Sequence, residues 1–337
     1  MAITPVFGTT TTQGIESQSF TIKGTSTAFR VLTQNLYSNK EQSVVREICA
    51  NAYDSHVMAG KADVPFKVTL PTEWDPNFTV EDSGVGLSLD EAIRSLSTVF
   101  ESTKEETNEQ VGAFGLGSKS PFAIADSFSV ECVKDGMLCK LLIFKGDDGM
   151  PQISTIAHTS TDKENGVKVV VAVSATNQGR FNREAARALV AFNPAPVCNK
   201  ELDGIWNHVK YETDDFMVID GGIVTGPTYV LNGPVLYVCG DNNILSTLFL
   251  KYGYSLVIKT NIGELSIPPN REGLDDTVDN ALVIHRKVDI FIKHHRECLK
   301  QWVDTHLTTM TPLQLMRGVL NDKIAPPLTT AWVDQSI

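Results

Sequence analysis

The spacing of apolar and polar residues predicts helices and strands that alternate through the first half of the chain. Residues 40–59 carry apolar side chains at the spacing of one helix face, and this helix is expected to end at Gly60; the side chains are Val44, Val45, Ile48, Ala52 and Val57. A second helix is predicted after Ser88, because Glu91 follows three residues later in the order of a capping box. Alternating or β-branched runs predict strands at 18–23, 66–71, 77–82, 127–134, 137–145, 151–158 and 166–174. Further helices are predicted at 25–37, from the glycines of 112–117 to about residue 125, and at 178–192.

The second half begins after a segment, residues 191–204, whose Pro, Asn and Gly content is typical of a linker. We therefore expect the domain boundary between about residue 175 and residue 200. Strands are predicted near 215–219, 227–238, 254–259 and 262–267, followed by a long helix over 275–306. The apolar stripe of that helix is expected to pack on its own sheet, with a dimer contact as the alternative; the stripe is Val278, Leu282, Val288, Phe291, Leu299 and Trp302.

Composition excludes several classes of protein. The chain has 337 residues, 42% hydrophobic and 20% charged, which allows one large domain or two ordinary ones with a packed core. No apolar run approaches the roughly 20 residues of a membrane span, and the first residues carry no pattern of a signal peptide. With 29 basic and 40 acidic residues the net charge is −11, so direct nucleic-acid binding is not expected. Six cysteines without a CxxC pair argue against a zinc ribbon or a disulfide scaffold.

The first candidate for chemistry is a polar stripe on the helix over 40–59. Glu47, Asn51 and Asp54 are separated by four and three residues, which places them near one face, about one and two turns apart. A carboxylate can orient water and an amide oxygen can bind a hard cation. A solvated helix face carries the same residue types, so the stripe alone leaves both interpretations open.

The second candidate follows a predicted strand, in the segment from Glu81 to Gly86. Asp82 at a strand end can accept a hydrogen bond from an exocyclic amine, and Gly84 and Gly86 let the backbone bend close to a flat ring. A plain turn is the alternative.

The third candidate is a glycine-rich segment that opens a helix after a polar loop over 98–111. Backbone N–H groups and the positive end of the helix dipole would face an anion there. The segment consists of Gly112, Ala113, Phe114, Gly115, Leu116, Gly117, Ser118 and Lys119. A Walker A loop is excluded, because the GxxxxGK[ST] spacing is absent and no buried strand leads into the segment.

These three motifs occur in the order and spacing of the Bergerat ATP-binding fold, and the chain resembles the GHKL superfamily of gyrase, heat-shock chaperones, histidine kinases and MutL. It also resembles the phage rIIA family over roughly residues 18–305. That resemblance rests on LYSNKEQSVVREICANAYDSH (36–56), FESTKEETNEQVGAFGLGSKSPFAIADSFSV (100–130), GGIV (221–224) and IPPNREGL (267–274). Members of the rIIA family have a further C-terminal region.

The resemblance implies an α+β fold in four parts. These are an N-terminal arm over 1–17, a Bergerat ATP-binding α/β sandwich over 18–180, a smaller α/β transducer-like domain over 200–306 that ends in the long helix, and a C-terminal tail over 307–337.

The resemblance also implies roles for the candidate residues. Glu47 would be the general base, Asn51 would bind Mg²⁺, and Asp82 would accept from the adenine amino group beside Gly84 and Gly86. Asp54 would support the base and the phosphates. An ATP lid would span 98–118, with Ser102, Thr103 and the backbone amides of 112–118 near the phosphates. Lys119 would meet a phosphate or tie its helix to Glu47 or Glu101, and both readings stay open.

The resemblance also implies that the transducer-like domain contributes an arginine to the site. Arg271, in the segment before the long helix, would offer its guanidinium to the γ-phosphate; the alternative is a surface salt bridge with Glu272 or Asp276. The sequence also departs from the superfamily, because Val167 stands where a threonine often helps to hold adenine through water. Weaker selection of the base is therefore expected.

The function implied by the resemblance is a slow, Mg²⁺-dependent ATPase. It would act as a nucleotide-driven conformational and dimerisation switch in phage–host interaction, in lysis timing or in resistance to host defence. The alternative is a nucleotide-dependent binding module that inhibits or recruits a host protein without hydrolysis. Expected partners are a second copy on ATP binding and an rIIB-like or host protein, in the host cytoplasm or peripheral to the inner membrane.

Overall fold

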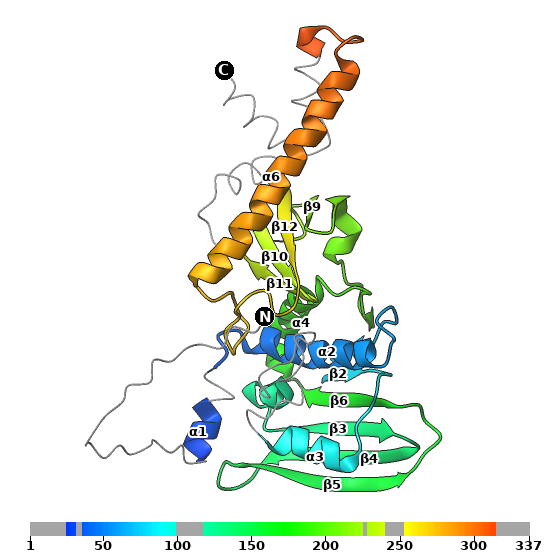
Figure 1. The fold of residues 1–337 in the computed structure, drawn as a ribbon. Coiled ribbons are helices and arrows are strands. Elements are labelled where there is room, and N and C mark those ends of the chain that lie inside the picture. The colour runs from blue at the N-terminus through cyan, green and yellow to red at the C-terminus, as the bar shows by residue number, and fades with distance from the viewer. Residues whose placement is uncertain (1–24, 32–35, 99–116, 225–227, 240–252, 315–337) are drawn as a thin grey trace, which may run out of the picture.

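A computed structural model describes residues 25–31, 36–98, 117–224, 228–239 and 253–314 (Figure 1). The first domain is built on a seven-stranded sheet with the order β5-β4-β3-β6-β2-β1-β7. Its strands are β1 (Lys67–Thr69), β2 (Asn77–Glu81), β3 (Ser127–Lys134), β4 (Met137–Lys145), β5 (Pro151–Ser160), β6 (Gly166–Ala172) and β7 (Val197–Cys198). Neighbouring strands are antiparallel except β1 and β7, which run parallel.

Helices pack on this sheet to form a two-layer sandwich (Figure 1). They are α1 (Ser26–Arg30), α2 (Lys40–Met58), α3 (Leu89–Ser97) and α4 (Gln178–Leu189), with the 3₁₀ turns η2 (Gly117–Ala123) and η3 (Ala175–Asn177). Burial alternates along β2, where Phe78 and Val80 face the core between more exposed neighbours. The same core contains Val45 and Ile48 of α2 and Phe181 of α4. The face of α2 that packs on the sheet thereby fixes the direction of its other side chains.

The second domain is a five-stranded sheet with the order β11-β10-β12-β9-β8. It comprises the 3₁₀ turn η4 (Ile205–His208), β8 (Val209–Glu212), β9 (Phe216–Asp220), β10 (Thr228–Asn232), β11 (Val235–Val238), β12 (Tyr254–Thr260) and α6 (Val278–His306). Both faces are covered: Phe216 of β9 packs with Phe291 of α6, whereas Met217 clusters with Ile205 of η4. Figure 1 shows α6 crossing this sheet and continuing beyond it.

The mixed α+β fold, with two sheets and a long C-terminal helix, confirms the expected fold class. The bounds of β3 and β4 coincide with the predicted strands. The chain returns to the first sheet at β7, inside the segment expected to be a linker, and residue 180 lies within α4. Residues 1–17 and most of the expected tail lie outside the described residues.

Three expectations for the second domain are wrong. The single strand over 227–238 is a hairpin, β10 and β11, that turns at Gly233 with φ of 57°. The strand over 262–267 is a turn, in which Gly263 has φ of 83° and the Glu264 carboxylate accepts from the Asn261 N–H. Val278 and Leu282 of the long helix are 76% and 62% exposed, so the stripe that packs on the sheet begins later, at Val283 and Ile284.

Candidate functional site

A cavity of about 760 Å³ lies where α2, α3, β2, β6, η2 and the loop before α6 meet. Segments that are far apart in the sequence contribute to it, and the two ends differ in chemistry. One end holds Asp82 and the other holds Glu47 and Arg271. Of the candidate residues named from the sequence, those that line it are Glu47, Asn51, Asp82, Gly86, Gly117, Ser118 and Arg271.

Helix geometry determines which residues of α2 reach the cavity. At 3.6 residues per turn, Asn51 is rotated about 40° from Glu47 and Ser55 about 80° in the same sense, while Asp54 is rotated about 20° in the other sense. Glu47, Asn51 and Ser55 accordingly line the cavity. Asp54 is buried and is not among the lining residues. The structure therefore brings Asn51 to Glu47 as expected but turns Asp54 toward the protein interior.

Asp82 lies at the end of β2 and is held by hydrogen bonds from two sides. Its Oδ1 accepts from the Ser55 hydroxyl at 3.0 Å and from the Gly84 N–H at 2.9 Å. Burial raises the pKa of Asp82, and these hydrogen bonds partly offset that rise. A fixed carboxylate at one end of a largely apolar cavity can recognise a ligand through an amino group.

Apolar side chains form the walls around Asp82. They come from α2, β2, β3, β6 and the α3 region, and they are Ile48, Ala52, Val80, Leu87, Leu96, Phe128, Val130, Val167 and Val169. Gly86 adopts φ of 67°, and a Cβ built on it would lie 1.9 Å from the Val133 carbonyl oxygen, so a side chain has no room there. Apolar walls of this kind suit a flat ring, and Val167 supplies no hydroxyl to them.

The opposite end of the cavity is charged and buried. Glu47 is 5% exposed and lies between two arginines, with Oε2 3.5 Å from Nη1 of Arg271 and Oε1 3.9 Å from Nε of Arg46. Oε1 accepts no hydrogen bond from any residue that the structure describes. Gly117 lies beside it, and a Cβ there would be 2.6 Å from Glu47 Oε2. A buried acceptor without a donor indicates that water or a ligand completes this end.

The position of Arg271 corrects the surface alternative drawn from the sequence. The residue is 4% exposed and its ion pair is with Glu47 of the first domain. Two tyrosines lie near this cluster, Tyr37 before α2 and Tyr237 in β11. Burial raises the pKa of both phenols, so both stay neutral beside the charged groups.

The glycine-rich segment is described only from Gly117 onward. Ser118 Oγ and Lys119 Nζ both donate to the Ser95 carbonyl oxygen, at 3.1 Å and 2.6 Å, which ties η2 to α3. Lys119 is buried and does not line the cavity. Ser102 and Thr103, together with Gly112, Ala113, Phe114, Gly115 and Leu116, lie outside the described residues.

Several residues of the site were not predicted from the sequence. Ser55 continues the four-residue spacing of Glu47 and Asn51, so this signal was available. Tyr237 approaches the site from the second domain, and Arg46 of α2 donates to the Asn270 carbonyl oxygen across the same contact, which no local pattern reveals. Tyr37 packs in the core of the first domain. The Nε2 of His56 accepts from the Ser83 N–H and its Nδ1 bonds the Val64 carbonyl, which ties α2 to the segment after Asp82.

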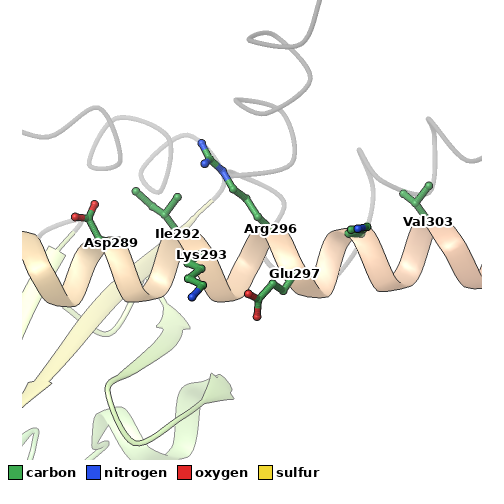
Figure 2. Close-up of a pocket in the computed structure, with 7 residues that line it drawn as sticks. Asp289, Ile292, Lys293, Arg296, Glu297 and Val303 are labelled. Atoms are coloured by element: carbon green, nitrogen blue, oxygen red, sulfur yellow. The ribbon is translucent and has the colours of Figure 1, made fainter.

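A second hollow runs along α6, and all the described residues that line it belong to that helix. These are Asp289, Ile292, Lys293, Arg296, Glu297, Lys300 and Val303 (Figure 2). Figure 2 shows Ile292, Arg296 and Val303 projecting to one side of the helix. Acid, base and apolar side chains alternate here without a shared focus, so the cavity beside α2 is the stronger candidate site.

Within the described parts of the chain, no three His, Cys, Asp or Glu side chains are grouped to hold a metal ion. The described helices also include none with the length and apolar character of a membrane span.

Comparison with known proteins finds relatives of the first domain. Residues 37–163 match the family of histidine kinase-, DNA gyrase B- and HSP90-like ATPases. The chaperone protein HtpG of Cupriavidus metallidurans is 31% identical over 133 residues, which are 32% of this chain and 20% of that protein. HtpG of Bordetella parapertussis is 27% identical over 168 residues, 43% of this chain and 26% of that protein. The chain thus spans about a fifth to a quarter of the length of these relatives.

The matched segment contains α2, Asp82 and the rest of the chain as far as β5. It therefore supplies most of the residues that line the cavity. The chain therefore carries an ATPase domain of the GHKL type, with HtpG as a distant relative at low identity. Arg271 and the rest of the second domain lie outside the match.

Proposed function

We propose that the cavity binds ATP, with the base against Asp82 and the phosphates at the end that holds Glu47. The observation that carries this proposal is the difference between the two ends of the cavity. One end holds the half-buried carboxylate of Asp82 among apolar walls, and the other holds the buried, incompletely hydrogen-bonded Glu47 beside arginines. An aromatic ring with an exocyclic amine fits the first end, and a charged triphosphate with its water fits the second.

The side chain of Asn51 is a suitable ligand for the Mg²⁺ that GHKL ATPases use. Its side chain lines the cavity one turn from Glu47, and it makes no hydrogen bond to another described residue. An amide oxygen is a hard ligand, and Mg²⁺ in nucleotide sites takes one or two protein ligands together with phosphates and waters. When bound, the ion would neutralise phosphate charge.

Hydrolysis needs a base and stabilisation of charge. Glu47 accepts a proton from a water as the water oxygen attacks the γ-phosphorus; the bond to the bridging oxygen breaks, and ADP leaves with that electron pair. Arg271 supplies positive charge to the phosphoryl oxygens. Because Arg271 is paired with Glu47, its move toward phosphate would free the base, and slow turnover is expected.

The test separates binding from hydrolysis. Glu47→Ala is expected to retain ATP binding, measured by calorimetry, and to lose about 100-fold or more in the rate of phosphate release. Asp82→Ala is the matched control at the other end and is expected to lose binding. Wild-type protein that does not bind ATP would refute the proposal.

A nucleotide-dependent binding module remains the second candidate. The Arg271–Glu47 ion pair favours it, since the arginine engages the carboxylate that hydrolysis would need as a base. Retained biological activity of Glu47→Ala, without hydrolysis, would support this candidate over the ATPase.

We further propose that ATP drives a conformational and dimerisation switch, and that an rIIA-like phage protein uses it against its host in the host cytoplasm, through an rIIB-like or host partner. Support comes from the segments over 36–56 and 267–274, which meet in the structure at Glu47 and Arg271. Sedimentation with a non-hydrolysable ATP analogue is expected to show dimers. A protein that stays monomeric with bound nucleotide would contradict the dimerisation switch.

A further inference from the structure

The loop between β12 and α6 is bound to the N-terminal part of α2 on both sides of Arg271. On one side, Nη2 of Arg46 donates to the Asn270 carbonyl oxygen at 2.8 Å and to the Ser43 hydroxyl at 3.2 Å. On the other side, the carboxylate of Glu272 reaches the start of the helix. Arg271 therefore stands between two anchored neighbours.

Glu272 acts as a cap that a second domain supplies to α2. Its Oε1 accepts from the Asn39 N–H at 2.7 Å and from the Ser43 hydroxyl at 3.3 Å, and its Oε2 accepts from the Ser38 N–H at 3.1 Å. These donors lie at the positive end of the helix dipole, where N–H groups lack partners within the helix. Burial works against the charge of Glu272, but these hydrogen bonds outweigh it and lower its pKa.

The backbone of Arg271 has an unusual conformation between these two anchored neighbours. Its φ is 52°, in the left-handed region that residues with a Cβ seldom adopt. Such a conformation persists where the surrounding contacts over-determine it. Here it directs the guanidinium to Glu47, at 3.5 Å.

We propose that Glu272 is a positioning residue, which sets Arg271 against Glu47 by capping α2 from the second domain. This inference rests on the proposed ATPase function. Glu272 does not line the cavity, so it acts through Arg271 and not through contact with nucleotide. Loss of its carboxylate should slow turnover and leave nucleotide affinity unchanged.

The experiment compares Glu272→Ala with Glu264→Gln, a loop carboxylate of the same domain that pairs with the exposed Arg286. Glu272→Ala is expected to lower kcat by about 10- to 100-fold with KM and the Kd for ATP within about twofold of wild type. Glu264→Gln is expected to behave as wild type. In an Arg271→Ala background, Glu272→Ala should cause no further loss, because both act through one guanidinium.

Hydrogen exchange of the ligand-free full chain gives a readout that does not depend on ATP. The amides of Ser38 and Asn39 are expected to exchange faster in Glu272→Ala than in wild type. The role of Glu272 would be overturned if Glu272→Ala left the exchange rates of Ser38 and Asn39 or the kcat unchanged. It would also be overturned if the double variant with Arg271→Ala lost kcat by the product of the two single losses. Wild-type protein without ATP turnover would refute the proposed function instead, and the exchange rates alone would then decide whether Glu272 caps α2.

Discussion

Asp82 makes ATP binding dependent on pH in a direction that its environment sets. Burial raises its pKa, so its carboxylate takes up a proton at a higher pH than an exposed aspartate does. The protonated group is a poorer acceptor for an amine, and we expect ATP affinity to fall as the pH is lowered through this raised pKa. Titration with ATP from about pH 8 to about pH 4 measures the effect.

The matched variant for this prediction is Asp82→Asn, which should bind weakly at every pH in that range. A raised pKa also means that the folded state holds this proton more tightly than the unfolded state, so Asp82 itself favours the ligand-free fold at low pH. Loss of affinity without loss of folded protein, followed by circular dichroism, would agree with this sign. An affinity that is flat across the titration would contradict it.

Gly86 is the position where the site tolerates no side chain. Gly86→Ala would place a methyl group 1.9 Å from the Val133 carbonyl oxygen at φ of 67°. We expect it to lower the free energy of unfolding by more than about 1 kcal/mol and to weaken ATP binding. Gly179→Ala on α4 is the control, since its Cβ meets no atom within 4 Å, and it should be neutral or stabilising. Urea unfolding compares them; equal stabilities would refute the steric account.

At this scale, spacing within one helix predicted which side chains lie close together, but it did not predict the direction of each one. Glu47 and Asn51 share a helix face at a four-residue spacing, and α2 brings both to the cavity. Asp54 does not follow, because a small difference in rotation turns it into the interior. The approach of Arg46 to Asn270 joins residues 224 positions apart, and a pattern within one helix holds no information on such a contact.

Local capping controls the start of α3, the helix that borders the cavity. The Ser88 hydroxyl accepts from the Glu91 N–H, and the Glu91 carboxylate accepts from the Ser88 N–H. Ser88→Ala is expected to lower the free energy of unfolding by about 1 kcal/mol in thermal or urea denaturation. Ser97→Ala at the other end, where the hydroxyl bonds a helix carbonyl at 3.5 Å, should change it by less than about 0.5 kcal/mol. Equal effects of the two variants would show that the box does not stabilise α3.

Elements with strong periodicity were predicted from the sequence, whereas those governed by turns or edges were not. The capping box and the strands β3 and β4 are set by neighbouring residues. The hairpin after β10 carries an Asn-Gly pair at Asn232 and Gly233, a known turn signal that the apolar run around it concealed. The two-residue β7 forms only because the first sheet is already present to pair with it.

The two domains share an apolar contact beside the ion pairs. Ala50 of α2 clusters with Val235 and Tyr237 of β11, and Tyr237 is 3% exposed. Because α2 also carries Glu47 and Asn51, nucleotide bound to the first domain should stabilise the second through this contact. The expected consequence is that both domains unfold together and that ATP raises the temperature of the shared transition.

Tyr237→Ala tests this coupling, because truncating a buried aromatic side chain leaves a cavity that costs about 3–5 kcal/mol. We expect calorimetry to resolve two transitions in this variant, with ATP shifting only the one that belongs to the first domain. Tyr237→Phe keeps the ring and should retain one transition. Tyr229→Ala removes a buried tyrosine of the same sheet from the cluster on its other face, so it should destabilise the second domain while ATP still raises the shared transition. A single ATP-sensitive transition in Tyr237→Ala would mean that the hydrogen bonds of Arg46 and Glu272 suffice to couple the domains.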